Sequence, residues 1–491
     1  MRAKRSIKNT FLMLIPLLHI PPRLGLAQEG PSLCTEFRPD LCPLEDRLYE
    51  NFVWYDAGKT YLRLSNSIAN VGVWQLFIEP AGPVNPQTGK RPARQKTLCI
   101  TVDDDTLYKY YPVGEFEYHS PPCHEHLHLG RIARYALRQY TGLNQPPGSP
   151  GPIGEKVGFC LLDSDPYECT SCCGPVQGTA PSGAVFTACP EDINSQFAEG
   201  ISIGWQDTYD YKLDDQWIDL ENVVPGRYWL QSVVDPDRVI KQTSASNDTA
   251  LIPIFLALKD LYEPNDSREA VDGMPIGGLN SSNLSACQTI VDNLSIHREY
   301  IQEPTYPCFG DTPGDVDYFK IYFTDRGGSE HKVKIVFGDS SQTAFKDGNL
   351  DMELLDFGGG LLTRADTDDD DDDEEISLEN KSPGTYYVKV YGRNAVILPS
   401  GLSRPNSNYY YRLELTLPEP VCGDVNGDGQ INNADILVLG NCCPTCNGGN
   451  VPCHERGDVD GDCDVDCADR DILIDYVYLA EPLPENACSC P

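Results

Sequence analysis

The sequence has few basic residues for its size. Lys and Arg together number 38, against 74 Asp and Glu among 491 residues, so the formal net charge is −36 at pH 7. Nucleic-acid binding depends on cationic patches that neutralise phosphates, and this balance therefore argues against a nucleic-acid partner. It favours cationic partners and divalent metal ions instead.

Long hydrophobic runs are also missing. The apolar run Phe11–Ile20 has ten residues, whereas a membrane-spanning helix needs about 20, and no later run is long enough. Basic residues precede this run and the small-residue site Gly25-Leu26-Ala27 follows it, so we expect a signal peptide over residues 1–27. An uncleaved anchor is the alternative. The mature protein is expected to be secreted or at the cell surface, without a membrane segment after signal cleavage.

Cysteine, in contrast, is abundant, with 20 residues, which is typical of an oxidising compartment. Nine lie between Cys34 and Cys189 and nine between Cys422 and Cys490. Cys287 and Cys308 are the only pair in the middle and are expected to bridge. Because each of these two groups has an odd number of cysteines, at least one cysteine in each is either a free thiol or bridged to another module.

Three domains are expected, over residues 28–257, 258–417 and 418–491. The first two contain short alternating stretches, such as Arg227–Val234 and Lys332–Phe337, separated by turn signals, and these predict strands. The last has two Asp/Asn-rich loops, each followed by a short helical pattern. The predicted fold class is mainly β: a β-sandwich-like first domain, a second β-sandwich, and a small α-helical module with calcium loops.

Four histidines fall within ten residues, between His119 and His128, although the whole chain has only eight. His124, His126 and His128 recur at a period of two, so on a strand they project from one face and can converge on one ion. Three neutral imidazoles suit Cu(II), and zinc is also possible.

A second interpretation takes His124-Glu125 and His128 as a helical zinc-peptidase motif with Glu125 as the base. It is disfavoured because Pro121 and Pro122 resist a helix just upstream, and because it gives His126 no role. A purely structural histidine cluster is the third interpretation.

Further landmarks flank the cluster in a fixed order. These landmarks are Tyr61-Leu-Arg-Leu64, Lys156–Asp163, Asp207-Thr-Tyr209, Gln216–Leu220, Val224–Tyr228 and Ser246-Asn-Asp248. Taken with the string around His124, their order resembles the catalytic domain of the lysyl oxidase family over residues 36–257.

The resemblance implies a copper amine oxidase that makes its own quinone. Copper would be bound by His124, His126 and His128, and lysine tyrosylquinone would form by cross-linking Lys156 to Tyr209. Such an enzyme converts primary amines, either lysine side chains or small amines, to aldehydes with O2 and releases ammonia and H2O2. Asp207, two residues from Tyr209, is the candidate base or orienting group. Taken alone, Lys156 would be a surface lysine, Tyr209 a core aromatic residue and Asp207 a turn residue.

The chain also departs from the family pattern. Trp205 and Asp215 stand where the family often has half-cystines, which is consistent with loss of one whole disulfide. Cys160 could pair with Cys169, and Cys123 could reach Cys172 or Cys173. The pairing cannot be chosen from the sequence.

The middle region resembles the bacterial pre-peptidase C-terminal β-sandwich. The resemblance rests on Leu261–Asp266, Gly314–Phe319 and Pro383–Val388. Such modules accompany many secreted bacterial enzymes and have no catalysis of their own.

The C-terminal region contains two loops with the ligand spacing of calcium sites, and the pair resembles a dockerin or EF-hand-like module. Cys463 occupies the position of the expected turn glycine in the second loop. The module either docks a protein partner or caps the chain as a calcium-stabilised unit. The ligands are Asp424, Asn426, Asp428, Gln430, Asn432 and Asp435 in loop one, and Asp458, Asp460, Asp462, Asp464, Asp466 and Asp469 in loop two.

The favoured function is therefore a secreted, copper- and lysine tyrosylquinone-dependent amine oxidase with calcium as a further ion. A non-catalytic copper- and calcium-binding adhesion or matrix protein is the alternative, and a zinc peptidase is less favoured. The excess of negative charge favours cationic amines, either polyamines or protein lysines, as substrates.

Overall fold

The structure is a computed structural model of the chain. It describes residues 34–120, 125–142, 145–154, 158–168, 170–181, 183–276, 279–284, 289–298, 301–303, 306–311, 315–323, 326–337, 349–365, 373–397, 403–405, 407–418, 422–425, 431–442, 457–460 and 467–484. The signal-peptide prediction lies outside these residues, as do His124, Lys156, Cys123, Cys169, Cys287 and half of the calcium ligands. No helix in the described part of the chain has the length and apolar character to cross a membrane.

The N-terminal region consists of antiparallel sheets around a main hydrophobic core, with two smaller apolar clusters beside it among the described residues. Its sheets have the orders β13-β6-β7-β8-β9 with β1 on β7, β11-β10-β16-β17, β12-β14-β5-β2 and β15-β4-β3. The elements are β1 (Cys34–Phe37), β2 (Leu41–Pro43), α1 (Glu45–Leu48), β3 (Asn51–Asp56), β4 (Lys59–Leu64), β5 (Asn66–Asn70), β6 (Leu76–Pro80), β7 (Arg91–Thr101), β8 (Thr106–His119), β9 (His126–Leu129), β10 (Ala133–Gln139), β11 (Pro150–Ile153), β12 (Asp165–Pro166), α2 (Thr170–Cys173), β13 (Glu199–Ile201), β14 (Trp205–Tyr209), β15 (Trp217–Asp219), β16 (Gly226–Val234) and β17 (Thr249–Leu256).

Disulfides fasten this region, and three of them join two described cysteines: Cys34–Cys99, Cys42–Cys173 and Cys160–Cys189. The suggested Cys160–Cys169 loop is therefore wrong, and so is a Cys123–Cys173 bridge. Each observed partner is distant in sequence and is brought close by the sheets, which a spacing argument cannot anticipate. Among the described cysteines, Cys467 is a free, exposed thiol.

The second region is a β-sandwich, as predicted. Two four-stranded antiparallel sheets, β18-β29-β22-β25 and β21-β26-β23-β24, enclose one core. Strands β21 and β22 alternate strictly between buried and half-buried residues, as expected where one face of each sheet meets the core. The elements are α3 (Arg268–Asp272), β18 (Ile290–Ile296), β19 (Ile301–Glu303), β20 (Tyr306–Asp311), β21 (Val316–Phe323), β22 (Lys332–Phe337), β23 (Leu350–Asp356), β24 (Leu361–Ala365), β25 (Asp373–Ser377), β26 (Gly384–Gly392), β27 (Asn394–Ile397), β28 (Ser403–Pro405) and β29 (Asn408–Thr416).

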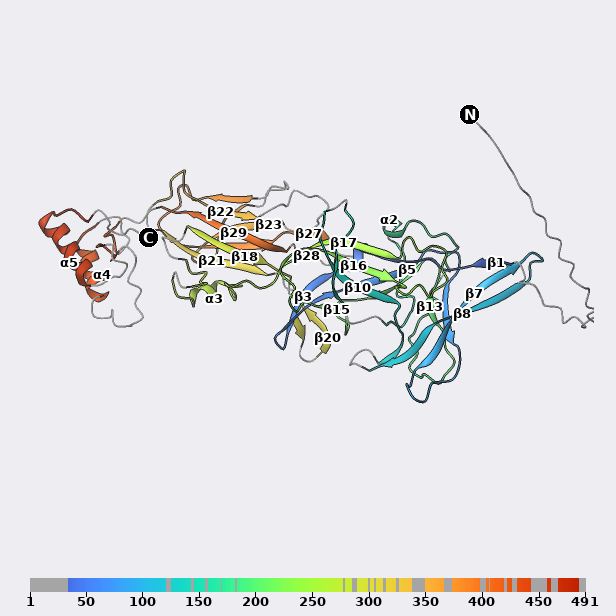
Figure 1. The fold of residues 1–491 in the computed structure, drawn as a ribbon. Helices are drawn as coiled ribbons and strands as arrows, with labels where there is room; N and C mark the ends of the chain where they lie inside the picture. The colour runs from blue at the N-terminus through green and yellow to red at the C-terminus, as the bar shows by residue number, and fades with distance from the viewer. Residues whose placement is uncertain are drawn as a thin grey trace, which may run out of the picture.

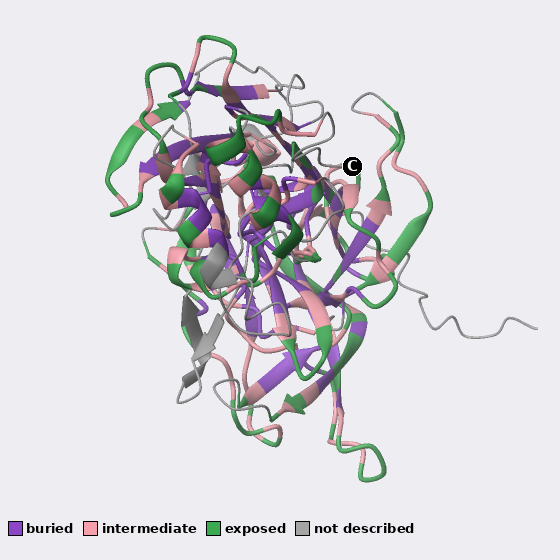
Figure 2. Ribbon diagram, turned by 90° about the vertical axis from the view of Figure 1, so that its left-hand side faces the viewer, coloured by how far each residue is buried: buried purple, intermediate pink, exposed green. Residues whose placement is uncertain are grey.

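The C-terminal region has the predicted helices α4 (Asn433–Cys442) and α5 (Cys467–Ile474), and α5 continues into a π-helical turn, η2 (Asp475–Leu479). A small apolar cluster that includes Leu439 and Leu473 joins them. Figure 1 shows α4 and α5 at one end of the chain, the sandwich in the middle and the N-terminal sheets at the other end. Buried residues follow the strands in the interior, whereas turns and some outer strands are exposed (Figure 2). Strand β8 is mostly exposed. The mainly β prediction is thus confirmed.

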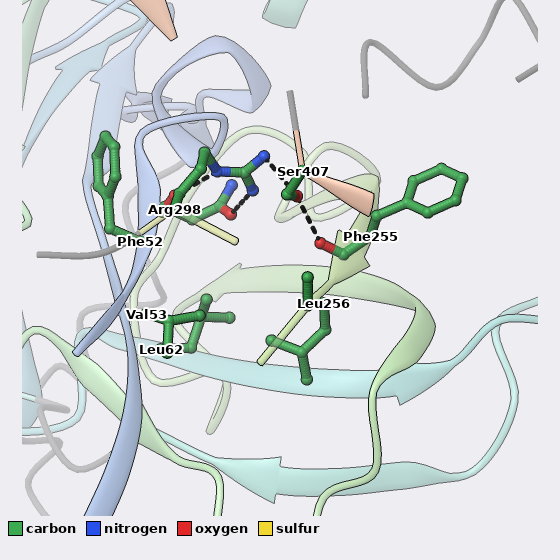
Figure 3. Close-up of a pocket in the computed structure, with 9 residues that line it drawn as sticks. Phe52, Val53, Leu62, Phe255, Leu256, Arg298 and Ser407 are labelled. Carbon is green, nitrogen blue, oxygen red and sulfur yellow. Dashed lines mark hydrogen bonds between the residues drawn. The ribbon is translucent and has the colours of Figure 1, made fainter. Parts of the chain in front are cut away.

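A buried arginine joins the first two regions. Arg298, just after β18, donates through Nε to the backbone oxygen of Asn51 at 3.1 Å and through Nη2 to the Asn51 Oδ1 at 2.6 Å. Its Nη1 donates to Ser407 Oγ at 2.9 Å, and Ser407 Oγ donates to the Phe255 oxygen at 3.0 Å (Figure 3). The backbone nitrogen of Val53 also donates to the Arg298 oxygen, at 2.6 Å. We call these contacts the Arg298 clamp.

Loss of the clamp is expected to destabilise the protein. Arg298→Ala removes the charged donors from two oxygens of the fully buried Asn51, and each lost bond of this kind costs about 1.5–3 kcal/mol. We expect the free energy of unfolding, measured by urea denaturation with Trp fluorescence, to fall by about 3–6 kcal/mol, the combined cost of the two bonds to Asn51. Arg131→Ala is the control, because that side chain is 76% exposed and pairs only with Asp237 at the surface. If both variants lose the same free energy of unfolding, the Arg298 clamp does not stabilise the protein as proposed.

Candidate metal and tyrosine site

Strands β8 and β9 bring three histidines together. The ladder pairs His119 with His126 and Glu117 with His128. His126 and His128 are alternate residues of β9, so both side chains project from one face. Their Nε2 atoms lie 3.2 Å apart, and adjacent nitrogen ligands on one ion with bonds of about 2.0–2.1 Å are separated by roughly 3 Å. The arrangement therefore fits a shared metal ion.

His119 belongs to this cluster, although its residue number was not among the predicted ligands. Its ring stacks on that of His128 with centroids 4.4 Å apart, and its Nε2 lies 3.1 Å from Asp215 Oδ2. A carboxylate on one side of an imidazole fixes the orientation of the ring. The signal for His119 was its place in the four-histidine string, whereas no sequence pattern points to Asp215.

The helical zinc-peptidase interpretation is wrong for the described residues. It requires His124 and His128 one helical turn apart, but residues 126–129 form strand β9. His128 pairs across the hairpin with Glu117 instead. A strand places alternate residues on one face, and this makes His126 and His128 the neighbouring pair.

The Cys160–Cys189 disulfide borders the histidine cluster. Both sulfur atoms and a ring nitrogen of His126 lie within 4.8 Å of one another. The sulfurs are bonded to each other, so neither is a thiolate available as a metal ligand. The disulfide instead forms one wall of the cluster and fixes the backbone of Cys160 beside it.

That backbone also holds Tyr209. The Tyr209 hydroxyl accepts a hydrogen bond from the Cys160 nitrogen and donates one to the Cys160 oxygen, both at 2.7 Å. The Phe159 ring packs edge-on against the tyrosine ring, with centroids 4.5 Å apart. Tyr209 is buried, and burial raises its pKa well above the ordinary value, with smaller contributions from Asp207 and Glu199. The phenol is therefore neutral at physiological pH.

Two buried carboxyl groups accompany Tyr209. Asp207 lies two residues away on β14, so both side chains project from the same face, and its Oδ1 accepts from Ser164 Oγ at 3.2 Å. Glu199 accepts from the Leu161 nitrogen at 3.2 Å, next to the segment that holds the phenol. Burial raises the pKa of Glu199 well above its usual range, and Asp207 raises it further. No sequence signal points to Glu199, which comes from a separate strand.

The structure also brings together part of each predicted calcium site. In loop two, one carboxylate oxygen from each of Asp458, Asp460 and Asp469 lies within 4.8 Å of the others. Asp469 Oδ1 accepts from the Val459 and Asp460 nitrogens at 2.6 and 3.1 Å.

In loop one, Asp424 and Asp435 are buried, and Asp435 Oδ2 accepts from the Asn432 nitrogen at 2.8 Å. The remaining predicted ligands lie outside the described residues, namely Asn426, Asp428, Gln430, Asp462, Asp464 and Asp466.

Comparisons with known proteins agree with the predicted order of modules. Residues 99–259 match the lysyl oxidase family model, residues 315–392 match the bacterial pre-peptidase C-terminal domain, and residues 422–478 match the dockerin type I domain. The resemblance of each region to its family is thereby confirmed.

Curated relatives match the first of these regions. Lysyl oxidase homolog 2 of Xenopus tropicalis is 26% identical over 182 residues, which cover 35% of this chain and 20% of the relative. Human lysyl oxidase homolog 3 is 29% identical over 132 residues, covering 26% and 14%, and human lysyl oxidase homolog 1 is 29% identical over 145 residues, covering 28% and 20%. The chain thus spans a fifth or less of the length of these relatives.

Proposed function

We propose that the N-terminal region is a copper-dependent amine oxidase that carries a lysine tyrosylquinone made from Lys156 and Tyr209. The observation that carries the proposal is the position of Cys160. Its disulfide lies against His126, and its backbone holds the Tyr209 hydroxyl. Cys160 therefore lies between the histidine cluster and the buried tyrosine and contacts both.

The residues present fit both groups. His126 and His128 place their Nε2 atoms 3.2 Å apart, close enough for both to bind one copper ion, and His124 is the third expected ligand. Lys156 precedes Cys160 by four residues, a span of at most about 14 Å of extended chain. When bound, copper supplies electron transfer with O2, and the quinone supplies the carbonyl and electron sink for the amine.

The side chains and backbone of the protein itself have five tasks in this reaction. His119 and Asp215 orient the ring of His128. The Cys160 backbone fixes the ring of Tyr209, and Phe159 excludes water from one side of it. Asp207 takes the proton from the carbon next to the amine nitrogen, and Glu199, whose pKa is raised by burial, holds a proton nearby. Overall, a primary amine, O2 and water yield an aldehyde, ammonia and H2O2.

We further propose a localisation, a substrate class, calcium binding and a protein partner for this chain. The relatives and the dockerin match support a secreted or cell-surface protein. The net charge of −36 favours cationic substrates, either polyamines or protein lysines. The two Asp-rich loops bind calcium, and the dockerin-like region docks a protein partner.

Peptide mapping tests the central proposal. Protein matured with copper and O2 is digested, and a peptide containing residue 156 is expected to be covalently joined to one containing residue 209. The intact protein should also give a coloured phenylhydrazine adduct. Copper-loaded protein that shows neither result would instead be a non-catalytic copper- and calcium-binding adhesion or matrix protein.

A further inference from the structure

A buried arginine on strand β4 contacts the loop that follows β14. Arg63 is 0% exposed, although it carries a charge that costs free energy to remove from water. Its Nε donates to the backbone oxygen of Tyr211 at 2.7 Å, and its Nη2 donates to that of Leu213 at 2.7 Å. The guanidinium carbon lies 4.8 Å from the ring centroid of Trp54 and 5.5 Å from that of Trp217. Carbonyl oxygens and aromatic ring faces therefore offset the cost of burying this cation.

The two carbonyl groups belong to the loop of residues 210–216, between β14 and β15. Hydrogen bonds also hold the two ends of this loop. The Gln216 side chain donates through Nε2 to the Tyr209 oxygen at 3.2 Å, and the Tyr211 nitrogen donates to Ser65 Oγ at 2.9 Å. Because the middle and both ends of the loop are hydrogen-bonded, the positions of its residues depend on one another.

The 210–216 loop joins the two halves of the proposed site. It begins directly after Tyr209, whose hydroxyl is held by the Cys160 backbone. Near its other end, Asp215 Oδ2 lies 3.1 Å from His119 Nε2, and the His119 ring stacks on that of His128. A displacement of this loop would therefore be felt at the histidine cluster.

Asp215 has a backbone conformation that the surrounding structure must enforce. Its φ is 61°, in the left-handed region, which Asp tolerates better than most residues but which still costs free energy. Such a conformation persists only where the neighbouring contacts determine it. The bond from Arg63 to the Leu213 oxygen, two residues earlier in the chain, is one of these contacts. Without it, Asp215 could relax away from His119.

We propose that Arg63 is a positioning residue that keeps Asp215 against His119. It does so by fixing two carbonyl groups of the 210–216 loop with the planar fork of its guanidinium, which a lysine ammonium cannot reproduce. With Asp215 in place, the ring of His119 is oriented and supports the stacked ring of His128. The inference rests on the proposed copper site and not on the quinone.

Copper titration of the full chain tests this coupling without turnover. Protein stripped of copper is titrated with CuSO4 in excess CaCl2 against a competing chelator, and the His126→Ala chain gives the background of copper held elsewhere. Asp215→Asn should weaken copper binding about 10-fold or more, and Arg63→Lys should weaken it in the same direction. The double variant should bind no more weakly than the weaker single variant, because two residues that act through one contact are not additive. The Cu(II) EPR spectra of the two single variants should depart from the wild type in the same way.

Arg298→Lys is the matched control, because Arg298 is also a buried arginine that donates to a backbone oxygen. It should keep the wild-type dissociation constant for copper, even where the free energy of unfolding falls. A wild-type constant in folded Arg63→Lys protein would overturn the proposal. Losses from Arg63→Lys and Asp215→Asn that multiply in the double variant would also overturn it, since Arg63 would then act by a separate route. A wild-type chain that binds no more copper than His126→Ala contradicts the proposed copper site itself, and with it this inference.

Discussion

Tyr209→Phe is expected to abolish amine oxidation and quinone formation while leaving bound copper in place. Phenylalanine lacks the oxygen from which the cofactor begins, so kcat for peroxide release should fall at least about 1,000-fold, a barrier increase of about 4 kcal/mol. Peroxide release from a primary amine and the phenylhydrazine adduct are the measurements. Copper content, measured on the same sample, should remain unchanged.

The control variant should lose about as much stability as Tyr209→Phe does. Tyr209→Phe removes both hydrogen bonds to the Cys160 backbone, which costs about 1–3 kcal/mol. Tyr135→Phe is a suitable control, because Tyr135 is fully buried and its hydroxyl also has two partners, Gln216 Oε1 at 3.1 Å and the Asn66 side chain. It should retain the adduct and most of the activity. Normal peroxide release by folded Tyr209→Phe protein would refute the cofactor assignment.

His126→Ala is expected to remove copper and, with it, both the quinone and the activity. The change deletes one of two ring nitrogens that lie 3.2 Å apart. Removing a group that only hydrogen-bonds to a metal ligand typically weakens metal binding about 10- to 100-fold. Loss of a direct ligand should therefore weaken copper binding by at least about 100-fold. Elemental analysis after dialysis measures copper, and phenylhydrazine measures the quinone.

His331→Ala serves as the matched histidine variant. His331 lies in the β-sandwich, where its Nδ1 accepts from the Gly328 nitrogen at 2.8 Å, and it has no contact with the cluster on β9. It should keep one copper ion per chain and full activity. If His126→Ala keeps stoichiometric copper, the metal is held elsewhere and the assignment of the histidine cluster fails.

Periodicity in the sequence was sufficient to predict much of the fold. Lys332–Phe337 alternates strictly, and it forms β22 with the expected alternate burial. His126 and His128 project together for the same reason, since a period of two determines the face of a strand. These features depend only on residues close together in the chain.

Features that depend on how distant segments meet could not be predicted. Cys160 pairs with Cys189 rather than with the closer Cys169, because the sheets determine which cysteines meet. Glu199 reaches the Tyr209 region from β13, and Asp215 reaches His119 from the loop after β14. Their partners are far away in sequence, and a single carboxyl group has no pattern that distinguishes it from surface acids.

The Cys160–Cys189 bridge has a consequence for the order of biosynthesis. It closes a loop of 29 residues, which in a chain-entropy estimate stabilises the fold by about 3–4 kcal/mol. The same bridge anchors the backbone that positions the phenol of Tyr209. In a reducing cytoplasm this anchor would be open, so the proposed cross-linking of Tyr209 is expected only after the bridge has formed in an oxidising compartment. Under the proposed function, the bridge would thereby delay cofactor formation until the chain has left the cytoplasm.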